Sequence, residues 1–459
     1  MLRDLFFVSV LGAFFLLGLR RPFLFIPAYI YADLIRPQYL TYWALNSVPV
    51  SQILFFCAFG FWGLSRHKGR PNWGGRQSLM LLLFVYCGIS TIFADFPVNA
   101  LTKWDWVWKV GLFALFLPLT LVTRLRFEAV LLVSVLSIGT NAISSGIKTL
   151  LSGSRYGSAS MLVDGNSGVY ESSAFACIAI AIIPLLFSLL RAGTVFPSKS
   201  RLVQLYGIGL IFACLIVPVA TEARTGLVCL FMLGLLLMRF VRHRFLYLVA
   251  VPLLIAAAVP LLPASFLDRM ETITTPKSDN SASTRLAVWR WTLDYTRDHP
   301  FGGGFDAYLG NQLHFDLTLD ARLDANNQST AGTGATISQK GRAFHSAYFE
   351  MLGEQGWPGL GLWLMIHALT FIRLEQLIRR HRAQGAAPDP WLSTMALGVQ
   401  QAHLIYLTGA LFVGIAFNPF AFNILGLGIA LTQLARQRHA SANPNRAFEL
   451  RAVGARKEG

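Results

Sequence analysis

The stretch Ser173–Leu190, SAFACIAIAIIPLLFSLL, contains no charged residue and decides the fold class. An apolar segment of roughly 20 residues is what an α-helix needs to cross the hydrocarbon core of a bilayer. Further apolar blocks are Gln77–Ala94, Gly111–Val122 and Leu202–Ala220. Transmembrane β-strands would instead appear as segments of about 10 residues with alternating polarity. The sequence therefore predicts an all-α, polytopic membrane helical bundle.

The composition of the 459-residue chain agrees with this prediction. Hydrophobic residues make up 54% of the chain and charged residues only 14%, whereas a soluble domain carries roughly 25% charged residues. Candidate spans are 5–19, 22–35, 48–64, 77–94, 105–122, 127–150, 173–190, 202–219, 225–241, 244–262, 346–370, 393–413 and 418–435. Because the first two are short, we expect about 12 spans. The first is interpreted as an uncleaved anchor, since Arg20-Arg21-Pro22 follows it without a small-residue cleavage site.

The net charge of +16 follows a pattern that is typical of membrane topology. Basic clusters fall in alternate inter-helix segments, at 66–76, 124–126, 191–201, 239–244, 373–382 and 436–457. An excess of Lys and Arg marks cytoplasmic loops. The connections 95–104, 151–172, 220–225 and 263–345 are therefore expected to face the periplasm, and the C-terminus the cytoplasm. Loop 263–345 is nearly balanced in charge, so we expect no nucleic-acid partner.

Cysteines and acidic residues give no sign of a metal site. The five cysteines lie in apolar segments and are interpreted as small buried hydrophobic residues: Cys57, Cys87, Cys177, Cys214 and Cys229. The sequence contains neither a CxxC pair nor a DxD motif. We therefore expect no metal and no cofactor.

The long loop divides the chain into four parts. Residues 1–262 hold about 10 spans, 263–345 form a large periplasmic loop, 346–435 hold about three spans, and 436–459 form a basic cytoplasmic tail. This organisation places a loop of unusual length between two blocks of membrane helices.

Within the loop, the residue pattern predicts two helices and a lid. Ser283-Thr284 can cap a helix that runs to about Arg297, and the glycines of Phe301–Phe305 (FGGGF) predict a sharp turn. Residues 311–342 are rich in small and polar side chains and are expected to form a flexible lid. A second helix is predicted to begin near Ala343 and to continue into the next span.

His345 is the strongest candidate for a catalytic residue. It follows the lid directly and lies one turn before a predicted span. Histidine is the side chain best suited to proton abstraction near neutral pH. We expect Ser346, Glu350 or Glu354 to orient its ring.

Several arginines share the boundary position of His345. Arg224 lies with Glu222 in the short turn Thr221–Gly226, Arg285 and Arg290 lie on the predicted loop helix, and Arg155 lies in the connection 151–172. Guanidinium groups bind diphosphates as planar, permanently charged forks. A neutral imidazole beside them would take the proton of an attacking hydroxyl, and the arginines would supply the positive charge that a metal gives elsewhere.

The stretch from His345 resembles the signature of O-antigen ligases and related polysaccharide polymerases. That signature is His345, the small polar Ser346, nine residues, Gly356, two residues and Gly359. The turn around Arg224 looks like the arginine element of the same family. Residues 1–37 and 283–305 are similar to O-glycosylation ligases associated with exosortase systems.

This resemblance implies a GT-C-like fold and a metal-independent, inverting transfer at the bacterial inner membrane. A glycan would move en bloc from undecaprenyl diphosphate to a hydroxyl acceptor on the periplasmic face. The acceptor would be lipid A core, a protein Ser or Thr, or a growing glycan, and membrane lipids surround the protein. The resemblance implies that His345 is the general base, that Arg224 holds the diphosphate, and that Arg285, with Arg290, approaches from the loop.

Two alternatives stay open. The first is a polymerase that joins repeat units, and the second is a transport or non-catalytic component of exopolysaccharide export. A transporter would place ionisable residues near mid-membrane in broken helices. The polar residues in the predicted spans, Asn141, His367, His403 and Asn418, are as well explained by helix contacts. The larger set of candidates at the membrane boundary favours transfer chemistry.

Overall fold

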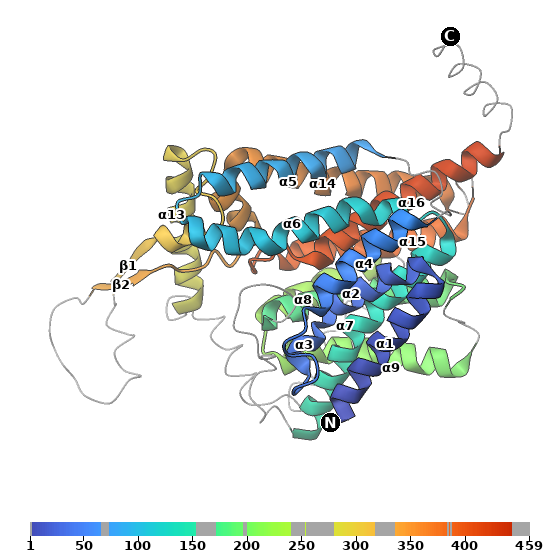
Figure 1. The fold of residues 1–459 in the computed structure, drawn as a ribbon. Helices are drawn as coiled ribbons and strands as arrows, with labels where there is room; N and C mark the ends of the chain where they lie inside the picture. Colours follow the sequence, from blue (N-terminus) through green and yellow to red (C-terminus); the bar gives the residue numbers. More distant parts are fainter. Residues whose placement is uncertain are drawn as a thin grey trace, which may run out of the picture.

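The computed structural model shows a bundle of long helices with a small helix-and-hairpin unit at one end (Figure 1). It describes residues 2–65, 73–152, 171–195, 200–239, 280–316, 336–382 and 388–442, and the single residues 253 and 385. By length and composition, six of the described helices can cross a membrane: α1 (Leu2–Arg20), α5 (Gly75–Ile92), α7 (Arg124–Ser152), α8 (Ser172–Ala192), α9 (Arg201–Ala220) and α14 (Ala347–His381). The all-α membrane bundle is confirmed, whereas the number of spans stays a prediction.

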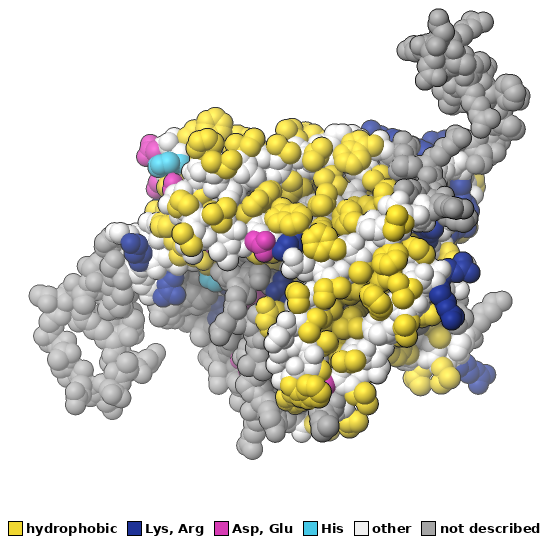
Figure 2. Space-filling view, in the orientation of Figure 1, with side chains coloured by type: hydrophobic (Ala, Val, Ile, Leu, Met, Phe, Trp, Pro, Cys, Tyr) yellow, Lys and Arg dark blue, Asp and Glu magenta, His cyan; other side chains and the backbone are white. Residues whose placement is uncertain are grey.

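Further described helices complete the bundle, apart from those of the loop unit at its end. They are α2 (Phe25–Ile35), α3 (Pro37–Leu40), α4 (Val50–Leu64), α6 (Pro97–Thr120), α10 (Arg224–Met238), α15 (Pro390–Gly409) and α16 (Pro419–Ala442), with the short 3-10 turn η1 (Pro22–Leu24). Hydrophobic side chains cover much of the flank of the bundle in Figure 2. An apolar flank of this extent is what lipid contact requires.

The centre of the bundle is the contact of α8 with α15, where small residues let the two helices approach closely. Gly398 lies against Ser188, and Gly409 against Cys177, so that a Cβ on either glycine would collide with its neighbour. The thiols of Cys177 and Cys229 both point to the carbonyl of Ile405, at 3.9 and 3.8 Å. Close packing of small residues is how membrane helices associate without a hydrophobic driving force. The prediction of buried, unpaired cysteines is confirmed for all but Cys57, which is half-buried.

The two ends of the bundle differ in charge. Most of the Lys and Arg side chains visible in Figure 2 lie at the end opposite α13 (Asn280–Asp298), which we call the basic end. There Arg124 binds Asp389 at 2.6 Å, and Arg438 binds the same carboxylate. The other end carries α13 and is called the loop end. This segregation agrees with the charge pattern of the sequence, and the side of the membrane that each end faces stays a prediction.

The loop end gathers more connections than the four predicted from the basic clusters. Backbone N–H groups of Tyr42, Trp43 and Ala44 donate to the carboxylate of Asp4, which anchors the connection between α3 and α4 to the start of the chain. The segment 410–418 between α15 and α16 also lies there, because Ala347 N–H donates to the Ala410 carbonyl.

The loop itself differs from its prediction in two places. Helix α13 begins at Asn280, so Ser283-Thr284 lie inside the helix, about one turn after its start, and not at its cap. The two ends of the predicted lid pair as antiparallel strands, β1 (Gln312–Asp316) and β2 (Thr336–Lys340). The hairpin forms because Leu313 packs against Val288 of α13 and Phe344. Residues 317–335 of the predicted lid lie outside the described residues.

The glycine-rich turn 301–305 docks against a kink in α14. Gly356 has φ +63°, and a Cβ there would collide with the Pro300 carbonyl. Across the kink, Trp357 N–H donates to the Pro300 carbonyl at 3.0 Å, and Gly304 N–H donates to the Glu354 carbonyl at 2.9 Å. Only glycine accepts this backbone angle without strain. The glycine of the sequence signature therefore has a structural reason: it bends α14 where the loop meets the bundle.

Candidate active site

A cavity of about 280 Å³ opens at the loop end between α6, α14 and the turn after α13. We call it the His345 pocket. Its chemically active lining consists of His345, Lys103, Glu171, Asp306, Glu350 and Glu354. The pocket therefore joins residues from both sides of the long loop and from the first half of the chain.

The backbone of His345 is held in an unusual conformation by the loop helix. His345 has φ +48°, in the left-handed region, where His is among the more tolerated non-glycine residues. Ser346 directly after it is the N-cap of α14. On the other side, Trp289 Nε1 of α13 donates to the Phe344 carbonyl at 2.9 Å, and its ring stacks on Phe349 at 4.8 Å. Helix α13 thus fixes the turn that presents His345 to the pocket.

The surroundings of His345 favour the neutral imidazole. Its pKa is lowered, first by burial of the ring and then by the positive charges of Arg285 and Arg342. A lowered pKa leaves the ring unprotonated at neutral pH, which is the state a general base needs. Within the described residues the ring makes no hydrogen bond, and the carboxylates expected to orient it have another partner.

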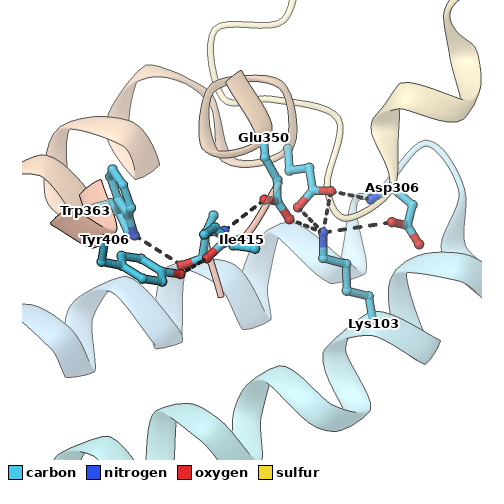
Figure 3. Close-up of polar contacts among 8 residues, drawn as sticks. Lys103, Asp306, Glu350, Trp363, Tyr406 and Ile415 are labelled. Atoms are coloured by element: carbon cyan, nitrogen blue, oxygen red, sulfur yellow. Dashed lines mark hydrogen bonds and ion pairs between the residues drawn. The ribbon is translucent and has the colours of Figure 1, made fainter. Parts of the chain in front are cut away.

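That partner is Lys103 of α6 (Figure 3). Its Nζ lies 2.7 Å from Glu350 Oε1, 2.8 Å from Glu354 Oε1 and 4.0 Å from Asp306 Oδ1. Glu354 also accepts from the Asp306 backbone N–H at 3.1 Å, and Glu350 Oε2 accepts from the Ala416 N–H at 2.9 Å. These four ionisable residues, the Lys103 cluster, tie α6, α14, the turn after α13 and the segment 410–418 around the pocket.

The cluster was missed by the sequence analysis although one signal pointed to it. Lys103 lies in the connection 95–104, which the charge pattern places on the side that Lys and Arg avoid. Ionisable residues within membrane helices usually pair with one another, so a lysine at this boundary is a candidate for a specific partner. The sequence predicts Glu350 and Glu354 as residues that orient His345, but it assigns no role to Lys103. Within the described ranges, no group of three or more His, Cys, Asp or Glu residues is placed to hold a metal ion.

Of the two loop arginines, Arg285 is the one near the pocket. Its charge acts on both His345 and Glu171. Arg290 is exposed on the surface of α13. Five residues along an α-helix correspond to a rotation of about 140°, so Arg290 points well away from the direction of Arg285.

Arg224 is the first residue of α10. The turn before it contains Glu222 with φ +50°, and Gly226 packs so closely on Pro218 and Ala176 that a Cβ there would collide with both. This packing places the turn beside the first part of α8, which begins at Ser172 directly after Glu171 of the pocket wall. Arg155 lies outside the described residues.

The acidic part of the pocket faces the same space as His345. The pKa of Asp306 is raised, mainly by loss of water around its carboxyl, although Lys103 opposes the change. The pKa of Glu171 is also raised by loss of water around its carboxyl, while Arg285 lowers it and Glu350 raises it. The pocket therefore combines hydrogen-bond-accepting carboxyl groups at Glu171 and Asp306 with the nearby positive charge of Arg285, which acts on Glu171 and on His345.

Comparisons with known families match two regions of the chain. The O-antigen ligase family matches residues 208–364, and a family of unknown function (DUF5935) matches residues 2–194. No curated protein shows a significant match. The first match includes Arg224, α13, His345 and the kink at Gly356, so it contains most of the pocket. The resemblance to O-antigen ligases is confirmed, whereas the association with exosortase systems stays a prediction.

Proposed function

We propose a specific reaction for this chain, because residues 208–364 match the O-antigen ligase family, whose activity is of the ligase or glycosyltransferase type. It transfers a glycan from undecaprenyl diphosphate to a hydroxyl acceptor at the bacterial inner membrane, with inversion and without a metal ion. The loop end faces the periplasm and the C-terminus the cytoplasm. The observation that carries the proposal is His345, kept neutral in a pocket beside Arg285.

In the proposed reaction, His345 is the general base. The acceptor oxygen attacks the anomeric carbon of the donor glycan, and its proton passes to the imidazole. The bond between that carbon and the phosphate oxygen breaks, and undecaprenyl diphosphate leaves with the electron pair. Arg285 from the loop and Arg224 from the bundle bind the leaving diphosphate, because fixed cations stabilise the charge that develops in the transition state.

The charge of Arg285 couples donor binding to the strength of the base. In the free protein, Arg285 lowers the pKa of His345. A diphosphate bound at Arg285 offsets that positive charge, so the pKa of the imidazole rises when the donor is in place. His345 is therefore a better proton acceptor in the complex than in the free protein.

The remaining pocket residues hold the acceptor and the geometry. Glu171 and Asp306 present acceptor oxygens to the hydroxyl groups of an incoming acceptor. Lys103, Glu350 and Glu354 touch no reacting atom in this mechanism; they position α14, and therefore His345, relative to α6. Lipid A core, a protein Ser or Thr and a growing glycan all supply the required hydroxyl.

The test is a transfer assay with the purified full chain in liposomes that contain the lipid-linked donor. His345→Asn is the informative variant, because Asn tolerates the left-handed backbone of this position. We expect transfer to fall by about 10²–10⁴-fold, the usual contribution of a general base. His299→Asn is the matched control, since His299 is exposed directly after α13, where its ring stacks on Tyr295 and its Nδ1 contacts the Tyr295 carbonyl, away from the pocket lining. Undiminished transfer by His345→Asn would exclude His345 as the base.

A chelator separates this proposal from metal-assisted transfer. EDTA added to the wild-type assay should leave the transfer rate unchanged, because arginines replace the metal in the proposed site. Strong inhibition that added Mg²⁺ reverses would contradict the metal-independent mechanism.

A further inference from the structure

A second cavity, of about 350 Å³, lies beside the His345 pocket. The two share Trp106 of α6 as a common wall. Lys103 and Thr102 line the first cavity and Lys109 and Val110 the second, so both open along one stripe of α6. Lys103 and Lys109 are about 9 Å apart along the helix axis, at 1.5 Å per residue. We call the second cavity the Asp33 pocket.

The Asp33 pocket is built almost wholly by the region that matches the family of unknown function. Its other walls come from α2, from the connection after α2 and from α4, and among the described lining residues only Pro419 comes from outside residues 2–194. Arg36, at the start of that connection, has φ +49°. The described non-glycine residues with positive φ are Arg36, Glu222, Asp306 and His345. Three of these four line one of the two cavities, and strained backbone of this kind clusters at functional sites.

The wall of the Asp33 pocket carries a buried acceptor that needs a donor. Within the described residues, Oε1 of Gln38 is buried without a partner, and the Asp33 carboxylate lines the same cavity. A buried acceptor without a donor costs about 1–3 kcal/mol. Ser51 and Gln52 add further hydrogen-bonding side chains to the wall. A ligand that carries several hydroxyl groups would satisfy these atoms.

The charges of the pocket are balanced. Asp33 and Arg36 interact with each other, and Lys109 binds Asp105 at 3.0 Å. A site for a phosphate would instead carry an excess of positive charge. The aromatic rings of Tyr29, Tyr39, Phe55 and Trp106 also line the cavity. Aromatic faces together with a few placed polar groups suit a ligand with both C–H and hydroxyl surfaces.

We propose that the Asp33 pocket binds a neutral sugar unit of a glycan and holds the chain that enters or leaves the His345 pocket past Trp106. This inference rests on the proposed function, because it assumes that glycans react at His345. It gives the region 2–194 a role in substrate recognition. The sugar belongs either to the donor glycan or to the acceptor glycan, and these sources share the same chemistry.

Binding can be measured without transfer. The probe is the free glycan released by mild acid from the lipid-linked donor of the source cells, titrated calorimetrically into the full chain in detergent. Asp33→Asn and Gln38→Ala should each weaken glycan binding by about tenfold, the loss expected for one buried hydrogen bond. Trp43→Ala is the control, because Trp43 is exposed on the same connection and lies outside the pocket. Inorganic diphosphate should not compete with the glycan.

The outcomes separate this proposal from the proposed function. Three results would each overturn the proposed sugar pocket. These are unchanged glycan affinity in both pocket variants, no glycan binding by the wild type, and competition by diphosphate. The proposed function is tested instead by His345→Asn, which should bind the glycan normally and fail to transfer it. In transfer assays, Asp33→Asn should raise KM for one substrate only. A raised KM for the acceptor would assign the pocket to the acceptor glycan. A raised KM for the donor would assign it to the donor glycan. Two unchanged KM values would contradict the proposal.

Discussion

The two ends of the bundle handle charge in opposite ways. At the basic end, the carboxylate of Asp389 is shared by Arg124 and Arg438, whose side chains are 34% and 50% exposed. At the loop end, Lys103 and Glu354 are 13% and 0% exposed and form part of a four-residue cluster. Exposed pairs contribute little to stability, whereas a buried cluster is costly to assemble and costly to break. The difference indicates that the buried charges of the loop end serve to hold the pocket residues in place, since insertion into the membrane does not require them.

The two histidine settings support the same distinction. His367 and His403 lie in the interior of the bundle and contact each other, Nδ1 to Nε2, at 2.7 Å. His345 lies at the loop end, faces a cavity and has no such partner among the described residues. The interior pair is therefore explained as a helix contact, and of these three histidines His345 is the one that faces a cavity.

The largest expected effect is on stability, from removal of Lys103. Lys103→Met leaves Glu350 and the fully buried Glu354 without their cation, and should lower the free energy of unfolding by about 3–5 kcal/mol. At the basic end, Arg438→Met leaves Arg124 on Asp389 and should cost less than about 1 kcal/mol. Thermal unfolding of the two variants in the same detergent measures the contrast. Equal losses would show that the two ends do not differ as described.

The kink in α14 should be the next most sensitive feature. Gly356→Ala places a Cβ against the Pro300 carbonyl at a backbone angle that only glycine adopts freely, and should cost about 2–4 kcal/mol. Gly361→Ala in the same helix is the control, because a Cβ there meets nothing within 4 Å. The yield and the melting temperature of the two purified variants measure the difference in stability. A Gly356→Ala protein as stable as the control would mean that the kink does not depend on glycine.

The loop arginines should differ in their effect on transfer. Arg285→Gln removes the charge near His345 and should lower kcat/KM by about 10–100-fold, within the range for loss of a group that stabilises transition-state charge. Arg290→Gln should change kcat/KM by less than about twofold, because Arg290 is exposed on another side of α13. Arg285→Lys should recover only part of the rate, since an ammonium cannot form the bidentate fork. A larger loss in Arg290→Gln than in Arg285→Gln would reverse the assignment.

The sequence predicted what depends on local pattern and missed what depends on distant contacts. The apolar blocks, the charge segregation, the loop helix and the position of His345 before α14 all follow from short stretches of residues. The Lys103 cluster joins residues separated by 247 and 251 positions, which no local pattern encodes. The hairpin of β1 and β2 was missed because it depends on the packing of Leu313 against α13. The Asp33 pocket was missed because its walls come from five separate segments.

The central claim is that a neutral imidazole at His345 removes the acceptor proton beside Arg285. The pH dependence of transfer tests it most directly. Because burial, Arg285 and Arg342 lower the pKa of His345, kcat/KM should be constant at neutral pH and fall only below about pH 6.5, the ordinary histidine value. Because the donor diphosphate offsets the charge of Arg285, kcat should begin to fall at a higher pH than kcat/KM. Arg285→Gln removes a charge that lowers the pKa of His345, so the fall in kcat/KM should shift to higher pH. A kcat/KM that already falls above pH 6.5, or an Arg285→Gln variant whose kcat/KM falls at a lower pH than that of the wild type, would contradict the account.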